Sequence, residues 1–201
     1  MSDSQARRRF NVVLALTVAR IPVAAAFCAV FLFLPGPKSS GVYVCFALLV
    51  LLELTDVLDG VLARRWRIVS EAGALLDPYA DSVSRLIVFW ALARRGLAMP
   101  SVPLVMALRD VTVAYCRIAL VRRGRTVAAR WSGKLKAVVQ GGAALLLVAV
   151  VASSRSALDR RVAVAVSWVV IFVTAASALE YLRAALAKEE RPSQTPTGIL
   201  P

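Results

Sequence analysis

Several near-continuous runs of apolar residues divide this chain of 201 residues. A helix needs about 20 apolar residues to cross the hydrocarbon core of a bilayer. Hydrophobic residues make up 59% of the chain and the mean hydropathy is +0.71, which exceeds the apolar share of an ordinary soluble domain. Because a backbone in lipid must satisfy its own hydrogen bonds, such runs favour helices. The sequence therefore predicts an all-α integral membrane protein.

Turn-forming and basic stretches separate the apolar runs into a bundle of six transmembrane helices, preceded by a short N-terminal interfacial segment at residues 1–10. We expect residues 1–187 to form one transmembrane domain. The polar, proline-containing residues 188–201 predict a disordered cytoplasmic tail. The expected helices cover residues 11–34, 43–64, 72–93, 101–121, 137–153 and 162–186.

The chain is strongly basic, with 25 Lys and Arg against 12 Asp and Glu and a net charge of +13. The basic residues lie at the ends of the apolar runs, which favours contact with anionic lipid headgroups over nucleic-acid binding. With six spans, fifteen Lys and Arg fall on the side of the N-terminus and six on the other. The positive-inside rule then predicts that both termini lie in the cytoplasm, and we expect the membrane to be the bacterial inner membrane. The six on the opposite side are Lys38, Arg94, Arg95, Arg155, Arg160 and Arg161.

Two short polar stripes interrupt the apolar pattern. Asp56 and Asp59 are three residues apart at the end of the second expected helix, and Asp77 and Asp81 are four apart at the start of the third. Each spacing places its pair on one helical face, and both pairs adjoin the same loop. If the faces meet, they form a cluster of oxygen ligands of the kind that hard divalent cations such as Mg²⁺ prefer.

Each polar residue also has an ordinary structural interpretation. A single aspartate near a helix end could pair with an arginine and fix helix register, but four carboxylates repel one another unless cations neutralise them. Gly60 and Gly73 allow close approach of a ligand, or simply close packing of helices. Arg20 lies deep in the first expected helix, where a charge is costly, so we expect it to face a polar cavity or an interface.

The chain contains no histidine, so a general base must be a carboxylate, lysine, tyrosine or thiol. Its cysteines, Cys28, Cys45 and Cys116, lie inside apolar segments without metal-ligand spacing. This placement favours small buried side chains over a disulfide or a metal site.

The two stripes together resemble the complete signature of the CDP-alcohol phosphotransferases. The resemblance implies transfer of a phosphatidyl group from CDP-diacylglycerol to an alcohol, with release of CMP, by a homodimer in the membrane. One position departs from the common pattern, because Ser82 follows the last aspartate where the family often has lysine. The matching residues are Asp56, Asp59, Gly60, Ala63, Arg64, Gly73, Asp77 and Asp81.

By the same resemblance, the four aspartates hold two Mg²⁺ ions, with Mn²⁺ as a possible substitute. Asp81 is also the general base that deprotonates the acceptor hydroxyl. The residues that line the CDP pocket are Gly60, Ala63, Arg64 and Gly73.

A phosphorylated acceptor needs cations, and four are expected near the same membrane face. Lys134 and Lys136 have an alternative role, since positive charge there would also set topology. The four residues are Arg109, Arg117, Lys134 and Lys136.

The stretches 109–117 and 128–140 resemble the phosphatidylglycerophosphate synthase branch, whose acceptor is glycerol 3-phosphate, although Asp110 replaces the usual Glu and Ala137 the usual Thr. Asn11, Thr17, Arg20 and Pro22 resemble the N-terminal region of that branch. The stretch 109–117 is also similar to bacterial phosphatidylinositol-phosphate synthases, so inositol 1-phosphate is the alternative acceptor. A cation transporter is a further alternative, but it requires a polar path that the last two helices do not offer.

Overall fold

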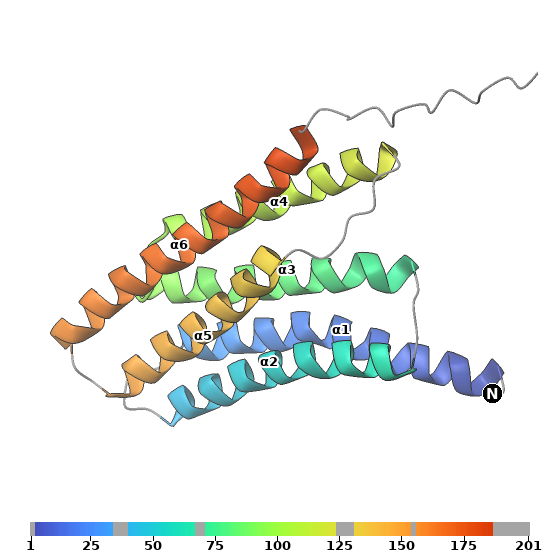
Figure 1. The fold of residues 1–201 in the computed structure, drawn as a ribbon. Coiled ribbons are helices and arrows are strands. Elements are labelled where there is room, and N and C mark those ends of the chain that lie inside the picture. The colour runs from blue at the N-terminus through green and yellow to red at the C-terminus, as the bar shows by residue number, and fades with distance from the viewer. Residues whose placement is uncertain (1–2, 34–39, 67–70, 124–130, 154–155, 187–201) are drawn as a thin grey trace, which may run out of the picture.

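The computed structural model describes residues 3–33, 40–66, 71–123, 131–153 and 156–186. These residues form six helices joined by short connections, and no strand occurs among them, which confirms the predicted all-α class (Figure 1). The second, third and fourth helices lie within two residues of their expected ranges, whereas the first, fifth and sixth begin six to eight residues earlier than expected. The helices are α1 (Asp3–Leu32), α2 (Gly41–Trp66), α3 (Glu71–Arg94), α4 (Ser101–Arg122), α5 (Trp131–Ser153) and α6 (Ser156–Leu186).

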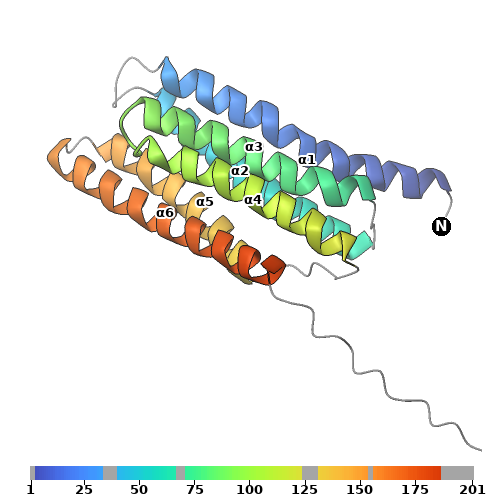
Figure 2. The same cartoon turned by 90° about the horizontal axis from the view of Figure 1, so that it is seen from above.

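Helix α1 begins earlier than the expected residue 11, because residues 3–10, predicted as an interfacial segment, continue the same helix. The helix is continuous over 30 residues, a length of about 45 Å. Its N-terminal turns project beyond the ends of α2 and α3 in both ribbon views (Figures 1 and 2). The reason is local: these residues include alanine, glutamine and arginines, which are good helix formers, and no proline or glycine.

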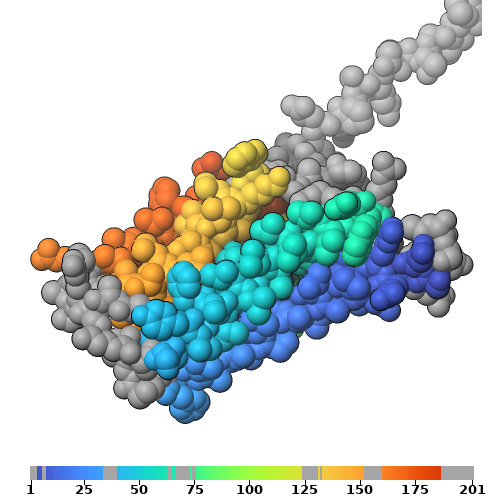
Figure 3. Space-filling model, turned by 90° about the horizontal axis from the view of Figure 1, so that it is seen from below, coloured from blue at the N-terminus to red at the C-terminus, as the bar shows by residue number. Residues whose placement is uncertain are grey.

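The helices pack as two joined groups (Figure 2). Helix α1 packs against α2 and α3, while α6 packs against α4 and α5. Helix α3 contacts α4 and α5, and α5 also contacts α2, so that these contacts connect the groups. One face of the molecule shows α1, α2 and α5 side by side (Figure 3). The polar residues of α1, α2 and α3 thereby come within reach of those on α4, α5 and α6.

The core is apolar at the end of the bundle away from the aspartates. Phe27 and Phe31 of α1 are fully buried and stack with ring centroids 5.2 Å apart. Arg95 caps this cluster, since its Nη1 donates to the backbone oxygen of Phe31 at 2.7 Å. Large apolar side chains such as Tyr43 and Phe172 are exposed on the outside, as expected for surfaces that face lipid.

Four of the described helices contain segments long and apolar enough to cross a membrane. Helices α3 and α4 are similar in length but carry several charged side chains, among them Asp81 in α3 and Arg109 in α4. The expected tail, residues 188–201, lies outside the described residues. The four segments are Arg8–Leu32, Gly41–Leu62, Gly133–Val151 and Arg160–Leu186.

Candidate functional site

The four aspartates of the two stripes converge on one arginine, Arg20 of α1. Arg20 Nη2 lies 2.6 Å from Asp56 Oδ1 and 3.0 Å from Asp81 Oδ1. Arg20 Nη1 lies 3.1 Å from Asp77 Oδ1 and 3.5 Å from Asp59 Oδ2. The arginine side chain is only 2% exposed. The expectation that Arg20 faces a polar site is therefore confirmed, and the faces of α2 and α3 do meet.

Three of the aspartates are close enough to share a metal ion. One carboxylate oxygen from each of Asp56, Asp59 and Asp77 lies within 4.8 Å of the other two. Asp81 joins the same cluster through its contact with Arg20. Oxygen donors at such separations fit a hard divalent cation, because Mg²⁺ and Mn²⁺ favour carboxylate ligands.

Thr17 adds a neutral contact from α1. Its hydroxyl lies 3.3 Å from Asp59 Oδ2 and 3.1 Å from the backbone oxygen of Val13, so it can donate to either. Asp59 is only 4% exposed, and a buried carboxylate requires such partners. One turn of α1, from Thr17 to Arg20, thus supplies both a hydroxyl and a cation to the aspartate cluster.

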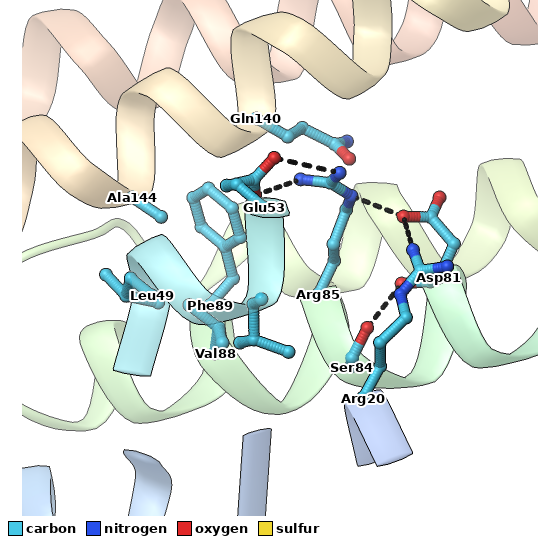
Figure 4. A pocket seen from close by; sticks show the side chains of 11 residues that line it. Arg20, Leu49, Glu53, Asp81, Ser84, Arg85, Val88, Phe89, Gln140 and Ala144 are labelled. Atoms are coloured by element: carbon cyan, nitrogen blue, oxygen red, sulfur yellow. Dashed lines mark hydrogen bonds and ion pairs between the residues drawn. The ribbon is translucent and has the colours of Figure 1, made fainter. Parts of the chain in front are cut away.

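A second arginine, Arg85, contacts the same oxygen of Asp81 as Arg20 does (Figure 4). Arg85 Nε lies 2.6 Å from Asp81 Oδ1, and Arg85 Nη1 lies 3.0 Å from Glu53 Oε1. The sequence analysis missed both Glu53 and Arg85. Helical spacing could have found them, since Arg85 is four residues after Asp81 and Glu53 is three before Asp56.

A large cavity of about 710 Å³ opens beside the aspartate cluster. Asp56, Asp77 and Asp81 contribute to its wall. The four cations predicted for an acceptor phosphate also line it, so the structure brings them to the same cavity as three of the aspartates. These cations are Arg109, Arg117, Lys134 and Lys136.

Lys136 lies between the aspartate cluster and the cations of α4 in the wall of this cavity. Its Nζ lies 3.3 Å from Asp110 Oδ1 and 4.0 Å from Asp81 Oδ2. Lys136 is 4% exposed, whereas Lys134 is on the surface. Asp110 Oδ1 also lies 2.8 Å from Arg109 Nη1, so one carboxylate oxygen contacts two of the cations.

Tyr181 of α6 lies against two arginines of α4, Arg109 and Arg117. The guanidinium carbons of Arg109 and Arg117 lie 5.7 and 5.6 Å from the centroid of its ring. The Tyr181 hydroxyl accepts a hydrogen bond from Arg117 Nη2 at 3.4 Å, and Ser177 Oγ accepts one from Arg109 Nε at 2.8 Å. The sequence analysis missed Tyr181 and Ser177, because α6 carries no motif near them.

The residues predicted to line a CDP pocket lie on the turns that carry the aspartates. Gly60 is on α2 beside Asp59, and Gly73 is in the first turn of α3 before Asp77. Both glycines are half-buried. Ala63 and Arg64 lie on the last turns of α2, and their side chains are outside the described part of the structure.

Together, the fold and site define a helical protein with apolar outer faces and a carboxylate cluster where α1, α2 and α3 meet. The chain belongs to the CDP-alcohol phosphatidyltransferase family, whose profile matches residues 10–189. Three relatives illustrate what it resembles within the family.

A probable phosphatidylglycerophosphate synthase of Mycobacterium tuberculosis (strain H37Rv) is 32% identical over 133 residues, which cover 66% of this chain and 63% of the relative. A CDP-diacylglycerol–glycerol-3-phosphate 3-phosphatidyltransferase of Mycoplasma genitalium is 40% identical over 87 residues, or 43% of this chain and 37% of the relative. A protein of the same description from Salmonella typhimurium is 30% identical over 141 residues, which cover 66% of this chain and 73% of the relative. The chain thus matches less than two thirds of the length of the first two relatives.

Proposed function

We propose that this protein transfers the phosphatidyl group of CDP-diacylglycerol to glycerol 3-phosphate, giving phosphatidylglycerol phosphate and CMP. The observation that carries the proposal is the single cavity whose wall combines three of the aspartates with four cations. Family membership supports the CDP-linked donor, and the descriptions of the relatives support glycerol 3-phosphate as the acceptor.

The aspartates are the proposed ligands for two Mg²⁺ ions, with Mn²⁺ as a substitute. Bound metal ions would neutralise the charge of the donor diphosphate and stabilise the CMP leaving group. The mutual proximity of Asp56, Asp59 and Asp77 supports this role, and Asp81 completes the set through its position beside them. Gly60, Ala63, Arg64 and Gly73 are proposed to line the site for CDP.

Asp81 is the proposed general base. Its carboxylate lies where the aspartate cluster adjoins the cations, since Lys136 Nζ is 4.0 Å from Asp81 Oδ2. In the reaction, Asp81 takes the proton of the acceptor hydroxyl and the hydroxyl oxygen bonds to the β-phosphorus. The bond from that phosphorus to the bridging oxygen breaks, and CMP leaves with the electron pair.

The phosphate of the acceptor is proposed to bind the four cations of the cavity. Arginine suits this role because its planar fork donates two hydrogen bonds to phosphate oxygens. Inositol 1-phosphate carries the same phosphate group and is the acceptor to test against glycerol 3-phosphate. The four residues are Arg109, Arg117, Lys134 and Lys136.

The membrane arrangement is part of the same proposal. Residues 1–187 form a domain of six spans, in which α3 and α4 cross the bilayer with their charged faces toward the bundle interior. The protein works as a homodimer in the bacterial inner membrane, with the site and both termini in the cytoplasm. The excess of Lys and Arg on that side supports the orientation.

The test is a panel of acceptors. Purified protein is incubated with CDP-diacylglycerol, Mg²⁺ and one acceptor at a time, and CMP release is measured. We expect release with glycerol 3-phosphate and loss of release when a chelator removes the metal. Release only with inositol 1-phosphate would assign the other acceptor. No release with any alcohol would contradict the proposed function.

A further inference from the structure

An ion pair between Glu53 of α2 and Arg85 of α3 lies next to the aspartate cluster (Figure 4). Arg85 Nη1 is 3.0 Å from Glu53 Oε1, and Arg85 Nη2 donates to Glu53 Oε2 at 3.4 Å. The Arg85 side chain is 9% exposed. A buried guanidinium needs such compensation, because a charge without partners is costly away from water.

The same guanidinium also holds two of the aspartates. Arg85 Nε lies 2.6 Å from Asp81 Oδ1, and Arg85 Nη2 lies 3.5 Å from Asp56 Oδ2. The guanidinium is planar and rigid, so the direction in which it faces Glu53 fixes the direction in which its Nε faces Asp81. Glu53 therefore influences the Asp81 carboxylate through Arg85, without touching it.

The room for the Glu53 carboxylate depends on a glycine of α5. A Cβ atom at Gly141 would lie 2.5 Å from Glu53 Oε2 and 2.6 Å from Glu53 Cδ. Any side chain at position 141 would therefore force the Glu53 carboxylate to shift from the position in which it faces Arg85. The next residue, Gly142, has open space, with nothing within 4 Å of the Cβ position.

We propose that Glu53, seated against Gly141, is a positioning residue that acts through Arg85 on the metal ligands Asp81 and Asp56. Glu53 neutralises Arg85, so that Arg85 orients the aspartates without competing with a metal ion for their oxygens. When Glu53 is displaced, the Arg85 charge is balanced only by the aspartates, and metal binding weakens. This inference rests on the proposed function, in which the aspartates are metal ligands.

The adjacent glycines provide a matched pair of variants. Gly141→Ala introduces the methyl group that displaces Glu53, and Gly142→Ala introduces the same group into open space. Both positions lie inside α5, so alanine raises the intrinsic helix propensity equally in each variant. Glu53→Gln removes the charge directly and provides a second variant if Gly141→Ala does not fold.

The experiment measures Mn²⁺ binding to the purified full-length protein in detergent, by electron paramagnetic resonance of the free ion. We expect the Mn²⁺ dissociation constant to rise about tenfold in Gly141→Ala and Glu53→Gln, the lower end for loss of a partner that orients a metal ligand. Gly142→Ala should bind Mn²⁺ like the wild type. Variants are compared only where size-exclusion chromatography gives a monodisperse protein.

Wild-type affinity in both Gly141→Ala and Glu53→Gln would overturn the inference, as would equal weakening in Gly142→Ala and Gly141→Ala. If the wild type binds Mn²⁺ and releases CMP while these variants are unchanged, only the positioning role fails. If the wild type neither binds Mn²⁺ nor releases CMP with any acceptor, the proposed function fails as well.

Discussion

The guanidinium of Arg20 lies 2.6 Å from the carboxylate of Asp56, although the two residues belong to different helices. The same guanidinium contacts the other three aspartates of the cluster, so one cation from α1 balances carboxylates from both α2 and α3. This contact explains how a helix can carry an arginine at such depth in an apolar run. Substitution of Arg20 should therefore affect all four aspartates at once.

Replacing Arg20 by glutamine should destabilise the protein and make its stability depend more on metal. Without the guanidinium, the carboxylate of Asp59, which is only 4% exposed, loses its counter-charge, and an unpaired buried charge costs about 3 kcal/mol. Divalent cations can replace that charge, so Mg²⁺ should raise the melting temperature of Arg20→Gln more than that of the wild type. Thermal unfolding of the two proteins with and without Mg²⁺ measures the loss of stability and the increase in melting temperature caused by the metal. Equal increases in the two proteins would contradict this role of Arg20.

Asp81→Asn should abolish turnover while leaving the binding of CDP-diacylglycerol largely intact. An amide cannot accept the proton of the acceptor hydroxyl, whereas the other three aspartates remain for the metal ions. CMP release and direct binding of the donor lipid are the two measurements. If donor binding is lost together with turnover, Asp81 acts mainly as a metal ligand and another group serves as the base.

Lys136→Gln should reduce kcat/KM for glycerol 3-phosphate about 100-fold, since a hydrogen bond to a charged group contributes about 1.5–3 kcal/mol. Lys136 is buried between Asp81 and Asp110, whereas Lys134 is exposed. Lys134→Gln should therefore have a much smaller effect. Initial rates at varied acceptor concentration measure both variants. Equal and small effects would favour the alternative in which the two lysines only set membrane topology.

Tyr181→Leu should raise the KM for glycerol 3-phosphate about tenfold with little change in kcat. Its ring contacts the guanidinium groups of both Arg109 and Arg117, and each cation–π contact contributes about 0.5–1 kcal/mol or more when desolvated. Tyr181→Phe keeps the ring and should have a smaller effect.

Acceptor-dependent initial rates separate KM from kcat in both variants. Tyr115→Leu is the control, because Tyr115 is 70% exposed on α4. A fall in kcat without a rise in KM would contradict the positioning of the two arginines by Tyr181.

The sequence alone determined the elements and the aspartate pairs. Apolar runs of sufficient length predict helices, and the spacing of Asp56 with Asp59 and of Asp77 with Asp81 places each pair on one face. These inferences are local, because a helix has a fixed period. The same periodicity could also have extended the stripes to Glu53 and Arg85.

Only the tertiary structure decided which faces meet. Arg20 of α1 contacts aspartates of α2 and α3, and Tyr181 of α6 contacts two arginines of α4. Gly141 of α5 leaves room for the side chain of Glu53 on α2. Helices that are apolar on almost every side give no sequence signal for the face turned to a neighbour, since lipid and the bundle interior are both apolar. Those contacts depend on how the helices pack, which no spacing along a single helix encodes.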